Sequence, residues 1–111
     1  MGALRAGEGH EMALRIERAF DDAVRIQVED HFAPEDAWRI HEVVNEVAPG
    51  AYVEIDFRRV RECGEVALSL LAKDMLGGRV RIAALGLSHR HERLLGYLGV
   101  LLPRTAVPEE Q

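Results

Sequence analysis

The sequence has few of the features that cross-link small domains or anchor them to membranes. It contains one cysteine, Cys63, in 111 residues, so an internal disulfide is impossible and a four-thiolate metal site is excluded. No apolar run approaches the roughly 20 residues of a membrane-spanning helix. Residues 1–11 also lack the apolar stretch of a secretory signal. These absences indicate a reducing compartment, and we expect a cytoplasmic protein without membrane insertion.

An excess of positive charge is also missing. The formal net charge is −5, whereas nonspecific binding to nucleic acid requires a basic face. With 48% hydrophobic and 30% charged residues, the composition is typical of one folded domain with one core. We expect residues 12–102 to form this domain, between a flexible leader over residues 1–11 and a flexible tail over residues 103–111.

Four segments alternate apolar and polar residues with a period of two, and this pattern predicts strands. They cover residues 13–18, 23–28, 51–57 and 79–85. Charged residues occupy many of the alternate positions, so the sheet is expected to have one packed face and one polar face. The side chains predicted to point inward are Leu14, Ile16, Val24, Ile26, Val28, Val53, Ile55, Phe57, Val80 and Ile82.

Three helices are predicted between and after the strands. The first begins at Pro34 and ends before Pro49, and the second runs from about residue 64 to residue 76 and ends at a pair of glycines. The third follows Ser88, the expected N-cap, and ends at Gly99. The expected inward side chains are Ala37, Ile40, Val44 and Val47, then Val66, Ala67, Leu70 and Leu71, then Leu94, Leu95 and Leu98.

The order of these elements is β-β-α-β-α-β-α. The short connection at residues 19–22 predicts an antiparallel hairpin, and strands separated by helices predict parallel pairing. We therefore expect an α/β fold with a mixed four- to five-stranded sheet and helices mainly on one face.

No enzyme motif is complete. The segment His41-Glu-Val-Val-Asn45 has an asparagine where the helical zinc motif requires a second histidine. His89 and His91 are two positions apart on a predicted helix, so their side chains diverge. His31 is interpreted as a loop residue. We therefore expect no catalytic residue, no metal site and no cofactor.

Two other side chains have a structural interpretation and a functional one. Cys63 precedes a predicted helix, where a thiolate is stabilised, but no histidine lies nearby in sequence and we interpret it as a packing residue. Trp38 lies beside the apolar stripe of the first helix, and we interpret it as partly buried in the core and not as a binding anchor.

The connections that follow the two predicted parallel strands should meet at one edge of the sheet. The N-termini of the second and third helices, each with partial positive charge, would then lie side by side. This arrangement is compatible with a solvated rim of mixed charge and with a docking edge for an acidic partner or a phosphate group. The charged residues around it are Arg58, Arg59, Arg61, Glu62, Glu65, His89, Arg90 and Arg93.

From residue 12 to residue 100 the chain resembles the STAS domain, the fold of bacterial anti-sigma-factor antagonists. The segment 53–60 is similar to the family's strand and loop, with Asp56 and Val60 at matching positions. Leu68 and Leu71 resemble the family's helix leucines. The segments 80–88 and 94–100 resemble its later strand, its G-L-S helix start and its closing L-x-x-x-G-[LV], and the family's element order agrees with the order predicted above.

The chain departs from this family at the phosphorylation motif. Where the family has D-S-S-G, this sequence has Gly64-Glu-Val-Ala67, and a gap-free alignment places Glu65 at the phosphorylated serine. Phosphoserine carries about −1.5 to −2 charges at pH 7, and Glu65 supplies one permanent negative charge. Glu65 is interpreted either as a fixed, partly phospho-like setting or as a favourable first-turn carboxylate. Ser69, in the helix interior, is disfavoured as a substitute phosphosite.

The sequence thus predicts a non-catalytic protein-interaction module. The resemblance implies an anti-sigma factor with a kinase-like fold as partner, or a transporter or signalling scaffold. The alternative is a small-ligand sensor for a nucleotide or phosphate, and a hydrolase or transferase has the least support. Homo-oligomerisation stays open. The residues expected to contact the partner are Arg58, Arg59, Arg61, Glu62, Gly64, Glu65, Ser88 and Arg90.

Overall fold

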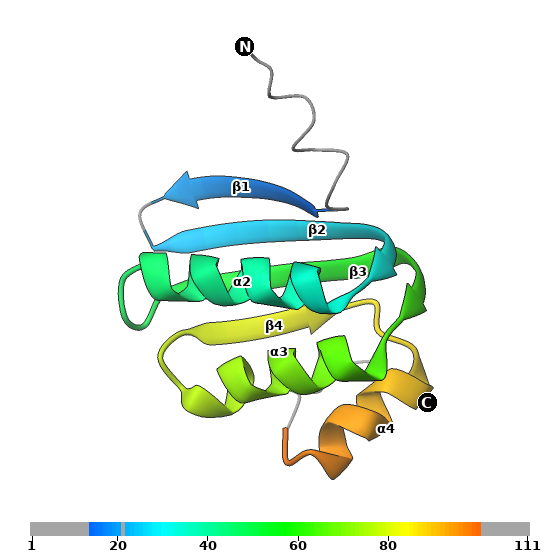
Figure 1. Ribbon diagram of the computed structural model, residues 1–111. Helices are drawn as coiled ribbons and strands as arrows, with labels where there is room; N and C mark the ends of the chain where they lie inside the picture. Colours follow the sequence, from blue (N-terminus) through cyan, green and yellow to red (C-terminus); the bar gives the residue numbers. More distant parts are fainter. Residues whose placement is uncertain (1–13, 21, 101–111) are drawn as a thin grey trace, which may run out of the picture.

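The structure, a computed structural model, describes residues 14–20 and 22–100, so the expected leader and tail lie outside the described residues. The elements follow the predicted order β-β-α-β-α-β-α (Figure 1). They are β1 (Leu14–Phe20), β2 (Ala23–Phe32), α2 (Pro34–Glu46), β3 (Tyr52–Cys63), α3 (Glu65–Gly77), β4 (Arg81–Leu85) and α4 (His89–Tyr97).

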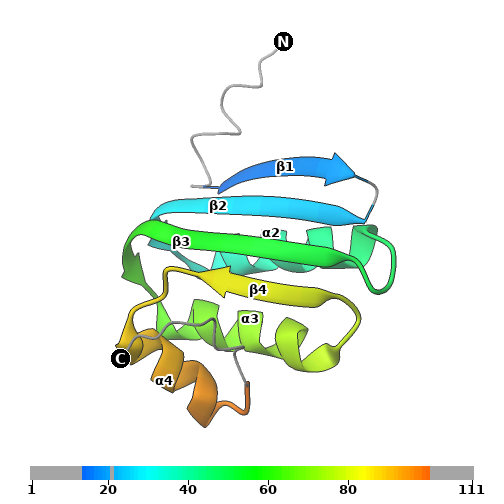
Figure 2. The same ribbon diagram turned by 180° about the vertical axis from the view of Figure 1, so that it is seen from behind.

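The four strands form one mixed sheet in the order β1-β2-β3-β4. β1 pairs antiparallel with β2, as the short connection predicted, and β2 with β3 and β3 with β4 pair in parallel. α2 and α3 cover one face of this sheet (Figure 1), and the view from behind shows the opposite face without a described helix (Figure 2). α4 lies beyond β4, next to the start of α3, so the predicted fold class is confirmed.

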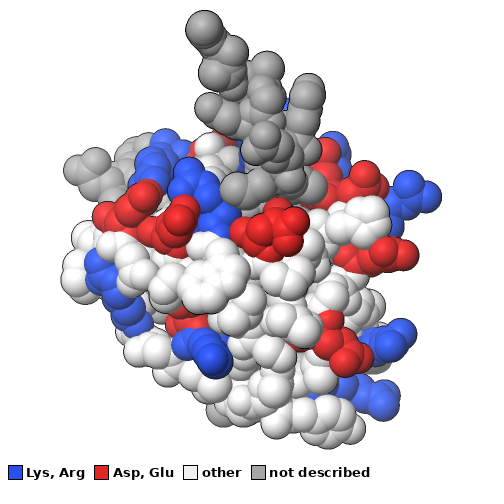
Figure 3. All heavy atoms as spheres, viewed as in Figure 1, with Lys and Arg blue, Asp and Glu red and all other residues white. Residues whose placement is uncertain are grey.

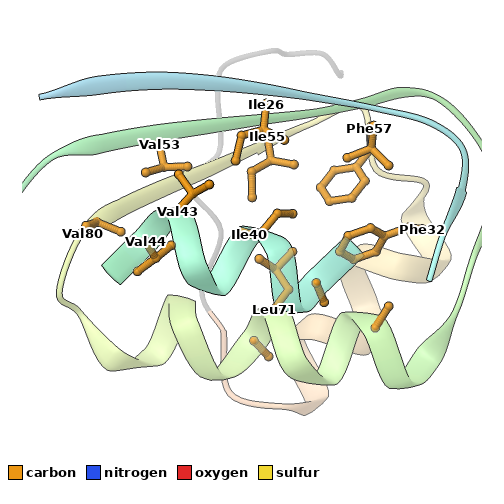
Figure 4. Packing of buried hydrophobic residues seen from close by; sticks show 14 of the residues in the cluster. Ile26, Phe32, Ile40, Val43, Val44, Val53, Ile55, Phe57, Leu71 and Val80 are labelled. Carbon is orange, nitrogen blue, oxygen red and sulfur yellow. The ribbon is translucent and has the colours of Figure 1, made fainter. Parts of the chain in front are cut away.

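The core lies between the sheet and the inner faces of α2 and α3 (Figure 4). Strand alternation accounts for it, because seven of the ten predicted inward strand residues are buried, and Leu14, Ile16 and Ile82 pack partly buried against them. Phe32 and Phe57 meet edge to face with ring centroids 5.1 Å apart. This core joins every described element.

The predicted inward sets of the helices contain two errors, and the separate interpretation of Trp38 is a third. Val66 is 63% exposed, because the buried side of α3 is made by the four residues Ala67, Leu68, Leu71 and Ala72. Leu98 is 37% exposed at the end of α4. Trp38 is 56% exposed and stacks edge to face on His41 on the outer side of α2, so its interpretation as a core residue is wrong.

β2 and β3 are longer than predicted. They remain paired as far as Phe32 and Cys63, with register irregularities between Gln27 and Glu29 and between Asp30 and His31. The prediction ended the strands where apolar alternation stops, but cross-strand charge pairs continue the pairing, and His31 Nε2 lies 3.0 Å from Glu62 Oε1. The connection after the third predicted strand was expected to form a loop over residues 58–65, but residues 58–63 belong to β3 and Glu65 already begins α3. His31, expected in a loop, is a residue of β2.

None of the three helices in the described part of the chain combines the length and the apolar composition that a bilayer span requires.

Gly86 sets how closely the β4–α4 connection approaches β3. Its φ is +79°, and a Cβ added there would lie 2.4 Å from Cγ of Arg58 and 3.0 Å from its Cα. A side chain at this position would therefore meet both a left-handed backbone and the neighbouring strand.

We predict that Gly86→Ala destabilises the protein more than Gly78→Ala does. Gly78 has a φ of +72° but nothing within 4 Å of an added Cβ, so its substitution should cost only the left-handed backbone penalty of about 1–2 kcal/mol. Gly86→Ala should cost about 1–3 kcal/mol more, because the methyl group overpacks against Arg58. Urea unfolding of both variants measures the difference, and equal costs would contradict the close approach.

Candidate docking groove

An open groove of about 800 Å³ lies at the end of the sheet where β2 and β3 finish. β3 and the start of α3 form one wall, and α4 forms the other. This is the side of the molecule on which α4 begins, to the right in Figures 1 and 3, where several Lys and Arg side chains project. The groove is lined by His31, Ala33, Pro34, Arg61, Glu62, Cys63, Gly64, Glu65, Arg90, His91, Arg93, Leu94 and Tyr97.

The structure brings together five of the eight predicted contact residues. The lining includes Arg61 and Glu62 at the end of β3 and Gly64 and Glu65 at the start of α3. On the opposite wall it includes Arg90 of α4. The other three, Arg58, Arg59 and Ser88, are not among the lining residues. Each of them has a different partner.

Arg58 is committed to Asp56. Its Nε and Nη2 donate to the two carboxylate oxygens at 3.0 and 2.8 Å, and its backbone N–H donates to the same carboxylate at 2.9 Å. The side-chain hydrogen bonds from Arg58 are the main reason that the pKa of Asp56 lies below its usual value. Gly86 packs against Arg58 from the other side. Arg58 therefore has a structural role at the sheet edge beside the groove.

Arg59 and Ser88 also have structural partners. Arg59 Nη1 lies 3.6 Å from Glu29 Oε2 across the β2–β3 pairing. Ser88 is the N-cap of α4, as predicted, because its hydroxyl accepts the backbone N–H of His91 at 3.2 Å. Ser88 therefore fixes where α4 begins.

The α4 wall presents a basic and aromatic stripe. Arg90, Arg93 and Tyr97 follow helical spacing, so their side chains lie along one side of α4, and all three line the groove. Tyr97 is 81% exposed. Neither Arg90 nor Arg93 forms an ion pair with another described residue. Sequence analysis did not single out Tyr97, although its spacing from Arg93 was visible.

The opposite wall carries mixed charge. Glu62 is paired with His31, and Arg61, whose side chain is 82% exposed, lies 3.8 Å from Asp30. Glu65 is exposed at the first position of α3, where a carboxylate interacts favourably with the helix dipole. Among the described residues, the groove charges without an ion-pair partner are therefore Arg90 and Arg93 on α4 and Glu65 at the start of α3.

The fold is shared with solved structures of other proteins. Neither a protein-family profile nor a curated protein matches the sequence. The anti-sigma factor antagonist SpoIIAA in its unphosphorylated form matches with a TM-score of 0.62 and 13% identity, over 85% of this chain and 90% of that chain. This chain has the fold of SpoIIAA. A second structure, of Mglu, matches with a TM-score of 0.54 and 16% identity, over 69% of this chain and 20% of that one.

The SpoIIAA fold confirms the STAS-like architecture expected from the sequence resemblance. In this SpoIIAA-like fold the groove lies at the carboxyl ends of the two central parallel strands. Loops at this end of a parallel sheet commonly carry binding residues. At the identities above, the comparison establishes the fold, and the roles of single residues are argued from the groove itself.

His41 does not take part in the groove. Its Nδ1 lies 2.8 Å from Asp74 Oδ1, and the Asn45 amide nitrogen lies 3.1 Å from its Nε2. The network joins α2 to α3. Within residues 14–20 and 22–100, no three His, Cys, Asp or Glu residues converge as metal ligands would.

Cys63 lies in the lining of the groove and packs against the core. Its thiol is half-buried, and burial raises its pKa to about 11. The raised pKa agrees with the interpretation of Cys63 as a packing residue. It disagrees with the alternative, in which the start of α3 stabilises the thiolate.

We predict that Cys63 reacts slowly with iodoacetamide in the folded protein. At pH 8 a thiol with a pKa near 11 has on the order of a hundredfold less thiolate than a free cysteine. Urea-unfolded protein should therefore alkylate at least that much faster. The rate for the folded protein should keep rising up to pH 10, and a plateau below pH 8 would contradict the raised pKa.

Proposed function

We propose that this chain is a non-catalytic protein-interaction module that docks a partner protein in the groove between β3 and α4. The stripe of Arg90, Arg93 and Tyr97 carries the proposal. Arginine and tyrosine are enriched at interfaces, and neither arginine forms an ion pair within the part of the chain that the structure describes. The fold shared with an anti-sigma factor antagonist supports it.

The predicted contact residues have different parts in this proposal. Arg61, Glu62, Gly64, Glu65 and Arg90 line the groove and contact the partner directly. The remaining three act beside it. Arg58 braces β3 through Asp56, Ser88 fixes the start of α4, and Arg59 flanks the groove on the exposed side of β3.

The resemblance to antagonists favours a cytoplasmic anti-sigma factor with a kinase-like fold as the partner. A transporter or a signalling scaffold is the alternative. In each case the partner must present acidic groups to the arginines of α4, since the local charge of that wall is positive.

We propose that Glu65 gives the groove a fixed negative charge where the antagonists have a phosphorylatable serine. Glu65 is exposed at the start of α3 and lines the groove, so a partner that distinguishes charge at this position would contact it. Ser69 is an unfavourable substitute, because its hydroxyl donates to the Glu65 carbonyl oxygen at 3.0 Å within the helix.

We predict that affinity capture from native extract depends on the α4 arginines. The wild-type chain should recover a specific partner, and Arg90→Glu with Arg93→Glu should lower its recovery at least tenfold, because acidic groups of the partner then meet like charges. The matched control is Arg15→Glu with Arg81→Glu, which changes the net charge equally at exposed positions outside the groove.

The same experiment tests Glu65. Recovery by Glu65→Ser should differ from wild type, and the recovered protein is identified by mass spectrometry. Equal recovery by all baits, or the absence of any specific protein, would contradict the docking proposal.

A nucleotide or phosphate sensor is the second candidate, and the size of the groove favours it. Its volume of about 800 Å³ lies within the range of about 300–1,000 Å³ for small-ligand pockets. Arg90 and Arg93 would bind phosphate, and Tyr97 would stack on a base.

We predict that calorimetric titration with ATP, GTP and inorganic phosphate separates the two candidates. For a sensor, one of these ligands at millimolar concentration should give heat that Arg93→Glu removes. No heat and no thermal shift with any of the three would exclude the sensor and leave the protein-docking proposal as the better account.

A further inference from the structure

The last part of β3 lacks a neighbouring strand on one side. β4 pairs only with residues Tyr52 to Asp56 of β3, whereas β2 follows β3 as far as Cys63. Because β4 is the other neighbour of β3 in the sheet, residues 59–63 have no described strand on their β4 side. Their outward backbone N–H and C=O groups form an open strand edge.

Among the described residues after β4, Gly86 approaches the beginning of this edge. The close approach of Gly86 is to Arg58. Beyond it, no hydrogen bond joins residues 86–88 to residues 59–63 within the described part of the chain. The groove borders this part of β3 through Arg61, Glu62 and Cys63, and it extends past the end of β3 to His31, Ala33 and Pro34 of β2 and the start of α2.

The two sides of the groove therefore offer two kinds of recognition. β3 offers backbone hydrogen bonds along five residues, a length of about 17 Å for an extended chain. α4 offers the positive charges of Arg90 and Arg93 and the ring of Tyr97. An extended segment satisfies both, since its backbone pairs with β3 and alternate side chains point toward α4.

The charge of the whole protein does not prevent an acidic segment from binding. The net charge is −5, but repulsion between exposed charges is largely screened beyond about 8 Å at physiological ionic strength. Within that distance the lining of the groove carries Arg61, Arg90 and Arg93 against Glu62 and Glu65, a formal charge of +1 (3 − 2). A carboxylate of the ligand is therefore attracted beside Arg90 and Arg93 and repelled beside Glu65.

We propose that the partner contributes an extended, acidic segment of about five residues that adds as a strand to the 59–63 edge of β3, with its carboxylates against Arg90 and Arg93. This inference rests on the proposed docking function and names the partner's recognition mode. A helical segment in the same groove would leave the strand edge without hydrogen-bond partners, so it is the less favourable occupant.

The irregular register of β3 limits this pairing to a short segment. Val60 pairs with Asp30 and Glu62 with His31, so Arg61 is an extra residue in the strand. Asp30 has a φ of +68°, a conformation that few residues other than glycine adopt. A bulge increases the local twist of the strand and disfavours pairing of its edge with a long strand. The edge is thus suited to a short specific ligand.

The probe for this proposal is a displayed library of random twelve-residue peptides, selected on the full wild-type chain. The selected peptides should carry acidic residues at alternate positions, because alternate side chains of a strand share one face. Their affinity should fall at least tenfold for Arg90→Glu with Arg93→Glu and stay unchanged for the control, Arg15→Glu with Arg81→Glu.

Backbone pairing is tested directly on one selected peptide. N-methylation of one alternating set of its amides should abolish binding, whereas methylation of the other set should leave it unchanged. Hydrogen exchange of the amides in residues 59–63 should slow in the complex. Acidic residues at helical spacing, indifference to both N-methylated sets, or no selected peptide would overturn the proposal.

The outcomes also separate this inference from the docking function. If affinity capture recovers a partner but the peptide results fail, the docking function stands and strand addition is wrong. If the peptides behave as expected but capture recovers no protein, the recognition mode stands and the partner role is wrong.

Discussion

Phe32 and Phe57 meet edge to face where β2 and β3 continue past the end of β4. Both rings are almost fully buried, so they hold the two strands together over the core while the strand ends project from it. The β3 side of the groove depends on this contact. The positions of Arg61, Glu62 and the start of α3 follow from the path of β3, and α4 closes the other side.

Electrostatics divides the groove into a balanced wall and an unbalanced one. Along β3 the charges are paired across strands, as with His31 and Glu62, and such exposed pairs contribute little to stability. Along α4, Arg90 and Arg93 have no described partner. An acidic protein thus concentrates positive charge at one place, a distribution that favours a specific encounter over general attraction to anions.

Much of the fold could be predicted from the sequence, because period-two alternation and helix-ending glycines are local signals. The element order, the sheet pairing and the Ser88 cap all followed from them. The extension of β3 could not be predicted, since its polar residues are stabilised by contacts with β2 that are distant in sequence. Arg58 was expected at the docking edge for a different reason: its charge was considered without Asp56, which lies only two residues earlier and engages its guanidinium.

The missing side chain at Gly86 has a structural consequence. The connection that leads into α4 rests directly on the backbone of Arg58, with no space for even a methyl group between them. The start of α4 is therefore placed directly against β3, at a residue that is itself held by the nearly buried Asp56. The absence of a side chain at this one position sets how close the connection into α4 comes to the opposite wall of the groove.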